Sequence, residues 1–271
     1  MTDTLHRILP QVQKPARYVG GEYNQIVKDK KNVDVRVAFC FPDTYEIGMS
    51  NIGMRILYGL MNEMPGVWCE RVFAPWGDME EQMRAHAIPL YALESHDPVK
   101  AFDLIAFTIG YEMSYTNILN MLELSCVPLL AREREGLENI VFAGGVCAVN
   151  PEPLTDFIDF FSLGEGEEIT KEIIDCYRQA KKDGCTKQEF LLRVSKIDGV
   201  YVPSFYEHTY NPDGTLADIR PKNGAPARVR KRIMQDMDKS YFPTKTIVPS
   251  TEIVHDRTNL EIFRGCIRGC R

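Results

Sequence analysis

Short apolar runs and amphipathic stretches alternate along residues 33–182. Runs that are apolar throughout, such as residues 102–109, predict buried strands, whereas apolar spacings of three and four residues, as in residues 50–61, predict helices. Strands are expected over residues 33–41, 67–73, 102–109, 140–143 and 157–163, and helices over residues 50–61, 78–86, 114–124 and 167–182. This alternation is typical of a doubly wound α/β fold of the flavodoxin-like or Rossmann-like kind, with a parallel sheet.

The pattern changes after residue 182. Thr186 and Glu189 form a capping-box sequence that predicts a helix to about residue 194. Short strands are expected over residues 199–202, 205–210 and 216–219, and residues 211–214 (Asn-Pro-Asp-Gly) predict the turn between the last two.

The last fifty residues contain two kinds of sequence. Residues 221–249 have little periodicity and are interpreted as a linker on the surface, whereas residues 252–263 regain strand character. We therefore divide the chain into an N-terminal arm (1–32), an α/β domain (33–182), a connecting segment (183–250) and the start of a further unit (251–271).

Composition narrows the class of protein. Hydrophobic residues make up 44% of the chain, which is enough for a packed core. A net charge of -6 without a basic stripe argues against nucleic acid as the main partner. No apolar run is long enough for a membrane span, and the N-terminus lacks a signal-peptide pattern. Six of the eight cysteines lie in apolar or helix-like patterns, as expected for reduced thiols in a cytoplasmic protein.

Glycines interrupt the chain directly after two of the predicted strands. Gly144 and Gly145 follow residues 140–143, and the sequence Gly164-Glu165-Gly166 follows residues 157–163. Because the carboxyl ends of parallel strands meet at one edge of a sheet, these glycines would let a large ligand lie close to the backbone there. The alternative is that both are ordinary turns. Glutamates at residues 165, 167 and 168 would be paired acids for proton transfer, although a helix N-terminus favours acidic residues in any case.

Cys266 and Cys270 form a C-x-x-x-C pair that follows the last predicted strand. Thiolates are the ligands of iron–sulfur clusters, and the glycines at residues 265 and 269 suit a loop that wraps a cluster. The alternative is two structural thiols. The five histidines are dispersed and have no zinc-site spacing, and no G-x-S-x-G sequence is present.

The loop after the first predicted strand resembles the D-x-H-x-x-G loop of cobalamin-binding domains. Asp43 and Gly48 keep their places, and Tyr45 stands where those domains have the histidine that ligates cobalt. The resemblance therefore implies a corrinoid without a protein imidazole on its lower face. The alternative is a helix-entry loop capped by Asp43.

Residues at the ends of other predicted strands also match cobalamin-binding domains. Ser114 and Thr116 match small hydroxyl residues that lie against the nucleotide tail of cobalamin, although both are also plain N-cap candidates. Gly144 and Gly145 match the glycine pair beside the tail, and residues 164–168 match a segment common in cobalamin-domain radical enzymes.

Taken together, these motifs resemble radical S-adenosylmethionine (SAM) proteins with an N-terminal cobalamin-binding domain, over residues 33–182 and 252–271. The resemblance implies that Cys266, Cys270 and a third cysteine hold a [4Fe–4S] cluster that reduces SAM for radical chemistry, with methyl transfer from cobalamin as one outcome. The third cysteine would fall three residues after Cys270, beyond Arg271. We therefore expect a longer protein, whose barrel begins at residues 251–271 and acts on a substrate that the sequence does not identify.

The present chain alone is expected to be inactive. Two further functions stay open: a module that holds a corrinoid without catalysis, and an interaction platform that has lost the corrinoid together with the histidine. A flavin or nucleotide enzyme is disfavoured because the chain lacks a phosphate-binding loop.

Overall fold

The computed structural model describes residues 2–257 and 259–269 and has an α/β fold built on one six-stranded sheet. The strands are β1 (Val35–Phe41), β2 (Val67–Phe73), β3 (Leu104–Thr108), β4 (Ile140–Gly144), β5 (Phe160–Ser162) and β6 (Val200–Tyr201). Their order is β2-β1-β3-β4-β5-β6, in which β1 to β5 run parallel and β6 is antiparallel. The order 2-1-3-4-5 is that of flavodoxin-like sheets, so the mostly parallel, Rossmann-like architecture is confirmed.

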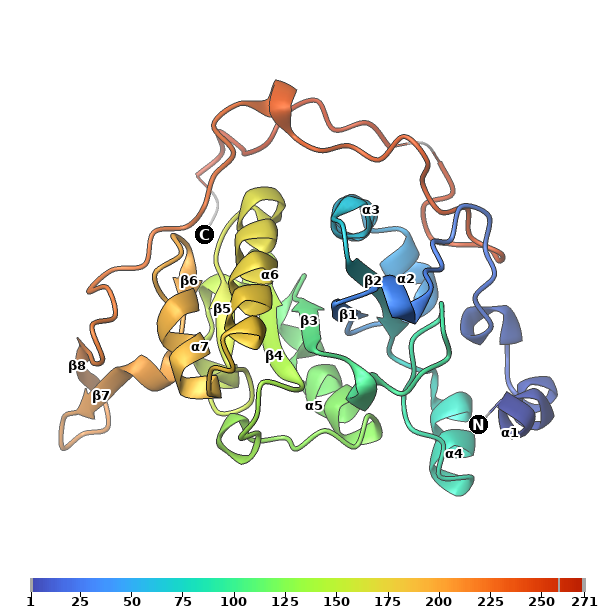
Figure 1. The fold of residues 1–271 in the computed structure, drawn as a ribbon, viewed down its shortest axis with the longest axis horizontal. Coiled ribbons are helices and arrows are strands. Elements are labelled where there is room, and N and C mark those ends of the chain that lie inside the picture. Colours follow the sequence, from blue (N-terminus) through green and yellow to red (C-terminus); the bar gives the residue numbers. More distant parts are fainter. Residues whose placement is uncertain (1, 258, 270–271) are drawn as a thin grey trace.

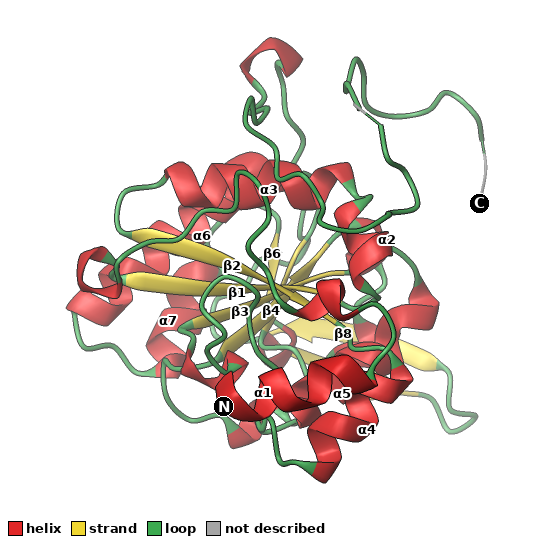
Figure 2. Ribbon diagram, turned by 90° about the vertical axis from the view of Figure 1, so that its right-hand side faces the viewer, coloured by secondary structure: helices red, strands yellow, loops and turns green. Residues whose placement is uncertain are grey.

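Helices cover both faces of the sheet (Figure 2). One face carries α1 (Thr2–Ile8), α4 (Gly77–Ala85) and α5 (Tyr115–Leu124), and the other carries α2 (Tyr45–Met49), α3 (Ile52–Glu63), α6 (Gly166–Lys182) and α7 (Lys187–Val194). Short 3-10 helices lie at Leu9–Gln11, Pro15–Tyr18, Lys30–Asn32, Val99–Ala101, Glu112–Ser114, Ala131–Glu133, Val146–Val149, Glu152–Leu154, Pro203–Phe205 and Met237–Lys239. Within the described residues no helix combines the length and the apolar character that crossing a membrane requires.

The strands are apolar on both sides because each side packs against helices. In β1, Val37 and Phe39 pack with the α3 and α6 side chains, whereas Ala38 and Cys40 between them pack with the α4 and α5 side chains. All four side chains are at most 3% exposed. The continuous apolar run therefore reflects a central strand with two buried faces.

The predicted strands and helices of residues 33–194 are present, with ends that shift by a few residues, and Thr186 and Glu189 form the expected capping box. The sheet continues past residue 182, because β6 pairs with β5 through Phe161 and Tyr201. The strand predicted over residues 252–263 is wrong, since the described part of that range forms no strand. A lone strand has no partner for its backbone hydrogen bonds and is not stable by itself.

A long irregular segment follows the hairpin of β7 (Tyr206–Tyr210) and β8 (Leu216–Pro221). We call its described residues 222–269 the strap. The strap leaves the hairpin, passes over α6 and α3, and reaches the N-terminal arm (Figure 1). Single backbone bridges fix it at Arg232, which pairs with Gly164, and at Val248, which pairs with Tyr23. The expected surface linker is thus a segment that crosses the molecule.

Candidate functional site

The carboxyl ends of β1, β3, β4 and β5 border a cavity of about 240 Å³, which we call the rim cavity. Phe39, Ala106 and Phe142 contribute sheet side chains, and α3 and α6 contribute Leu57 and Thr170 from the two sides. The strand order reverses between β1 and β3, and ligands of open α/β sheets bind outside the carboxyl ends at such a point. The rim cavity therefore lies where this architecture places its ligands.

Glycines form much of the wall of the rim cavity. Gly145 has φ +99° and Gly164 has φ +106°, which are values that other residues rarely adopt. A Cβ at Gly145 would stand 2.6 Å from the carbonyl oxygen of Ile109, whereas a Cβ at Gly110 would stand in open space. Six of the 19 glycines of the chain line this one cavity, so backbone without side chains forms part of its wall: Gly53, Gly110, Gly144, Gly145, Gly164 and Gly166.

The residues proposed from the sequence are only partly brought together. Gly144, Gly145, Gly164 and Gly166 line the rim cavity, and Glu165 lies between the last two.

The other candidates lie elsewhere. Asp43 is at the same edge of the sheet, where its Oδ2 accepts a hydrogen bond of 3.3 Å from the hydroxyl of Tyr111. Gly48 lies behind the ring of Phe73, which a Cβ would approach to 2.3 Å. Ser114 is buried and donates to the carbonyl of Tyr111, and Thr116 is exposed on α5.

Tyr45 does not face the rim cavity. Its side chain is 1% exposed, packs edge-on against Phe73 at 5.3 Å between ring centroids, and donates a hydrogen bond of 3.0 Å to Glu22. Burial and the neighbouring Glu22 carboxylate raise the pKa of the Tyr45 phenol. The first turn of α2 begins at this residue and rotates the ring into the core. Tyr45 is therefore a packing residue that ties α2 to the N-terminal arm.

Beside Tyr45 lies a buried ionic network that the sequence analysis missed. The Arg71 guanidinium in β2 donates to both carboxylate oxygens of Glu22 at 2.8 Å and to Glu94 at 2.6 Å. Burial opposes ionisation of Glu22, but the hydrogen bonds and charge of Arg71 outweigh it, so the pKa of Glu22 lies below its usual value. The available signal was the charged pair Glu70-Arg71 in the middle of an apolar strand.

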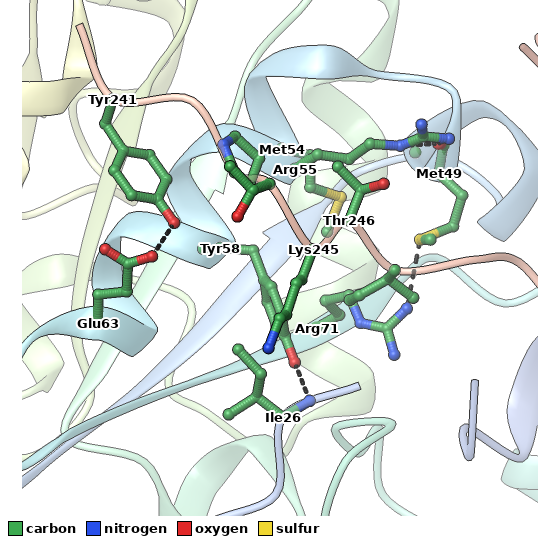
Figure 3. Close-up of a pocket in the computed structure, with 15 residues that line it drawn as sticks. Ile26, Met49, Met54, Arg55, Tyr58, Glu63, Arg71, Tyr241, Lys245 and Thr246 are labelled. Atoms are coloured by element: carbon green, nitrogen blue, oxygen red, sulfur yellow. Dashed lines mark hydrogen bonds between the residues drawn. The ribbon is translucent and has the colours of Figure 1, made fainter. Parts of the chain in front are cut away.

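A second cavity of about 300 Å³ lies between α3 and the strap, and we call it the strap cavity (Figure 3). Tyr241 and Lys245 of the strap form one side, and Arg55 and Tyr58 of α3 form the other. The hydroxyl of Tyr241 donates to Glu63 at 2.6 Å and closes one end. Arg55 donates through Nε and Nη2 to the carbonyl of Met49. No local pattern in the sequence marks this cavity, because its two sides are about 190 residues apart in the chain.

The glutamates at the start of α6 face the strap. Arg232 pairs with Glu168 at 2.9 Å and with Glu172 at 2.6 Å, whereas Arg264 pairs with Glu165 at 3.4 Å and with Glu167. Each of these carboxylates is paired with an arginine, so ion pairing accounts for them without a role in acid catalysis.

Of the two proposed cluster ligands, Cys266 is exposed, and Cys270 lies outside the described residues. The Cys266 sulfur accepts a contact of 3.4 Å from the backbone N–H of Arg268. Across residues 2–257 and 259–269, no three His, Cys, Asp or Glu side chains are grouped so that they could hold a metal ion. One thiol has the right chemistry but is not a ligand set, so the described residues by themselves do not form an iron–sulfur site.

Two comparisons place the chain among known proteins. It is 25% identical over 240 residues to an uncharacterized protein of Methanocaldococcus jannaschii, and the aligned region covers 87% of this chain. The same region is 40% of that relative, so the chain spans less than half of its length. No solved structure matches the chain. The family described as radical SAM proteins, N-terminal, matches residues 53–203, which include the strands β2 to β6 and the whole glycine-lined wall of the rim cavity. Because this match spans more than half of the 271 residues, the chain belongs to the N-terminal family of radical SAM proteins.

Proposed function

We propose that this chain is the cofactor-holding N-terminal part of a radical SAM enzyme, and that the rim cavity takes the nucleotide tail of a corrinoid. The observation that carries the proposal is the concentration of glycines around one cavity at the carboxyl edge of a 2-1-3-4-5 sheet. A cavity of about 240 Å³ is close to the lower end of the usual range for ligand sites, roughly 300 Å³. That size suits a flat bicyclic group better than a whole cofactor.

The residues around the cavity fit such a tail. Phe142 and Leu57 offer apolar surface, and the bare backbone at Gly144 and Gly145 lets a planar ring approach the strand ends. Ser162 and Thr170 supply hydroxyl groups for the polar atoms of the tail. A corrinoid bound here would receive no ligand from Tyr45, because that phenol is packed in the core and bonded to Glu22.

The larger part of a corrinoid would rest outside the cavity. The loops that follow β1 to β4 expose large apolar side chains at this edge, and Val146 among them also lines the rim cavity. We call these residues the apolar edge: Ile47, Trp76, Tyr111, Met113, Val146 and Val149, each between 42% and 81% exposed. Exposed apolar patches of this kind mark binding surfaces for a ligand or a partner.

In the full-length enzyme, Cys266 and Cys270 would be two of the ligands of a [4Fe–4S] cluster that supplies the electron for SAM cleavage. The chain's own residues would bind and orient the corrinoid and keep water from it. Leu260, Ile262 and Phe263, which are between 71% and 81% exposed, would be covered by the barrel that follows in such an enzyme. Substrate and reaction type, including methyl transfer, are open within this proposal.

An interaction platform without a corrinoid is the second candidate. It is favoured by the apolar edge itself, since the same side chains would serve a protein partner, and by the absence of an imidazole at Tyr45.

The two candidates differ in whether the chain takes up hydroxocobalamin. We expect the parent chain to retain the absorbance of hydroxocobalamin after gel filtration, and Gly110→Leu to lose most of it. Gly110 suits this test because it lines the cavity and a Cβ there meets no atom, so leucine adds bulk at the cavity wall without a backbone clash. Gly77→Leu is the matched control, because Gly77 also has open space around it but lies at the start of α4, away from the cavity.

Uptake by the parent chain and by Gly77→Leu, with loss in Gly110→Leu, supports the corrinoid site. If the parent chain binds no hydroxocobalamin, the corrinoid proposal is wrong and the interaction platform is favoured. If Gly110→Leu binds it as well as the parent chain does, the rim cavity is not the corrinoid site.

A further inference from the structure

The first turn of α6 is the place where the strap is held most firmly. Glu167 is 6% exposed, although a carboxylate at a helix start normally faces water or the helix's own N–H groups. No side chain caps the first N–H groups of α6. The Glu167 carboxylate instead accepts hydrogen bonds from Nη2 of Arg264 and, at 3.2 Å, from the hydroxyl of Ser240. Glu167 therefore connects α6 to the strap, a segment distant in sequence.

Arg264 uses its whole guanidinium in this contact. Its Nη2 pairs with Glu167, its Nη1 lies 3.4 Å from Glu165, and its Nε and Nη2 donate to Glu261 at 2.8 and 2.7 Å. The side chain is 18% exposed. Because the guanidinium is planar, its contacts with three carboxylates fix the orientation of the Arg264 side chain as well as its distance from α6. A lysine ammonium would not fix the orientation.

The same turn of α6 forms part of the wall of the rim cavity. Gly164 and Gly166, which flank Glu165, both line that cavity. The strap backbone is also paired there, because Arg232 donates to the carbonyl of Leu163 at 2.8 Å and accepts from the N–H of Glu165 at 2.9 Å. A Cβ at Gly164 would stand 2.1 Å from the Arg232 oxygen, so only glycine allows this approach. Residues 163–167 thus contact the cavity on one side and the strap on the other.

We propose that Glu167 and Arg264 are positioning residues that hold the Cys266 segment beside the rim cavity. Arg264 stands two residues before Cys266, so fixing its guanidinium fixes where the thiol can lie. The pair joins residues 97 positions apart in the chain. The contact itself depends only on the described residues, and its meaning for radical chemistry rests on the proposed function.

The test measures the distance from Cys266 to α6. One nitroxide is placed on Cys266 and a second on Lys171→Cys, an exposed position one turn after Glu167. Five cysteines that would also react are replaced by serine in every variant: Cys126, Cys147, Cys176, Cys185 and Cys270. Double electron–electron resonance then gives the distribution of distances between the two labels, with no corrinoid, iron or SAM present.

We expect a narrow distribution in the parent chain and a broad one in both Glu167→Gln and Arg264→Gln. Loss of one partner from a partly buried ion pair raises the population of the detached segment by up to roughly fivefold. Glu168→Gln is the matched control, because it makes the same chemical change one residue away, on a carboxylate that pairs with Arg232 rather than Arg264. It should keep the narrow distribution. High salt should broaden the parent distribution, since it screens the pair.

A broad distribution in the parent chain would overturn the inference. So would an unchanged distribution in Glu167→Gln, or equal broadening in Glu168→Gln, because the last result would indicate a general effect of charge at the helix start. Unfolding midpoints of all variants confirm that each is folded. Hydroxocobalamin uptake is measured on separate samples, so a chain that binds no corrinoid but holds Cys266 in place disproves the proposed function and keeps this inference.

Discussion

The N-terminal arm (residues 2–32) and the strap both run outside the sheet, but they are attached in opposite ways. The arm places Leu5 and Ile8 in the core, where they are 2% and 1% exposed. The strap leaves Ile262 and Phe263 81% and 71% exposed, and its buried positions within the described residues are Pro243 and Ile247. Apolar burial therefore holds the arm, whereas it contributes little to holding the strap.

The charged contacts of the arm are also more deeply buried than those of the strap. Glu22 of the arm and its partner Arg71 both have side chains that are 1% exposed, whereas Arg264 of the strap is 18% exposed. Removing one partner from a fully buried pair leaves a charge without solvent or counter-ion, and removing one from a partly exposed pair does not. We therefore expect the arm to be part of the folding unit, and the strap to detach while the sheet stays folded.

The two segments also touch each other. Val248 of the strap donates to the carbonyl of Tyr23 at 3.0 Å, and the side chain of Asn24 donates to Thr246 at 2.9 Å. The arm therefore supports the middle of the strap. Detachment of the arm from the core should also release this part of the strap.

Arg71→Met should be the most damaging of these substitutions. It leaves the carboxylates of Glu22 and Glu94 buried without their shared cation, which costs about 3–5 kcal/mol of the free energy of unfolding. Urea denaturation followed by circular dichroism measures the loss. Arg84→Met is the control, because Arg84 pairs with Glu80 on the surface and its loss should leave stability nearly unchanged. Equal stability of Arg71→Met and the parent chain would show that the arm is not anchored through this network.

Leu5→Ala and Phe263→Ala compare the two segments directly. Leu5 packs among the buried side chains of α4, including Met79 and Met83, so its truncation should cost about 2–3 kcal/mol, in the lower part of the range for leucine. Phe263 is 71% exposed, so its truncation should change the free energy of unfolding by about 0.5 kcal/mol or less. The same urea experiment measures both. Similar losses in the two variants would contradict the distinction between arm and strap.

The sheet could be predicted from the sequence because its signal is local. A central parallel strand is apolar on both faces and ends at glycine or proline, as β1 does at Pro42 and β4 does at Gly145, so a few consecutive residues identify it. Four of the six glycines of the rim cavity could be predicted for the same reason, because Gly144, Gly145, Gly164 and Gly166 lie at or just after the ends of β4 and β5. Gly53 lies in α3 and carries no such signal.

The contacts of the strap and of Tyr45 could not be predicted. Arg264 and Glu167 are 97 residues apart, and no periodicity connects them. Tyr45 occupies the position of a metal ligand in the motif, but its direction is set by the turn at which α2 begins and by Glu22 on a separate segment. Local sequence thus indicates which residues are near a strand end, whereas the orientation of a side chain depends on packing partners from elsewhere in the chain.

The smallest expected effect concerns the pH dependence of the arm. Glu46 of α2 accepts from Arg17 at 2.7 Å and from Lys14 at 3.2 Å, and both partners belong to the arm. Burial opposes the ionised form, but the hydrogen bonds of Arg17 outweigh it and hold the pKa of Glu46 below its usual value. A carboxyl with a lowered pKa in the folded state stabilises that state above the unfolded pKa, about 4.3, and the contribution is lost as the pH falls through the folded value.

Glu46→Gln removes this contribution and serves as the reference. Near neutral pH the parent chain should be more stable than Glu46→Gln by about 1 kcal/mol or less, because the pair is partly exposed. As the pH falls below about 4.3, protonation of Glu46 should reduce the difference between the two proteins toward zero. Urea denaturation of both proteins over this pH range measures the difference. A difference that stays constant with pH would mean that Glu46 holds the arm through its shape and packing rather than through its charge.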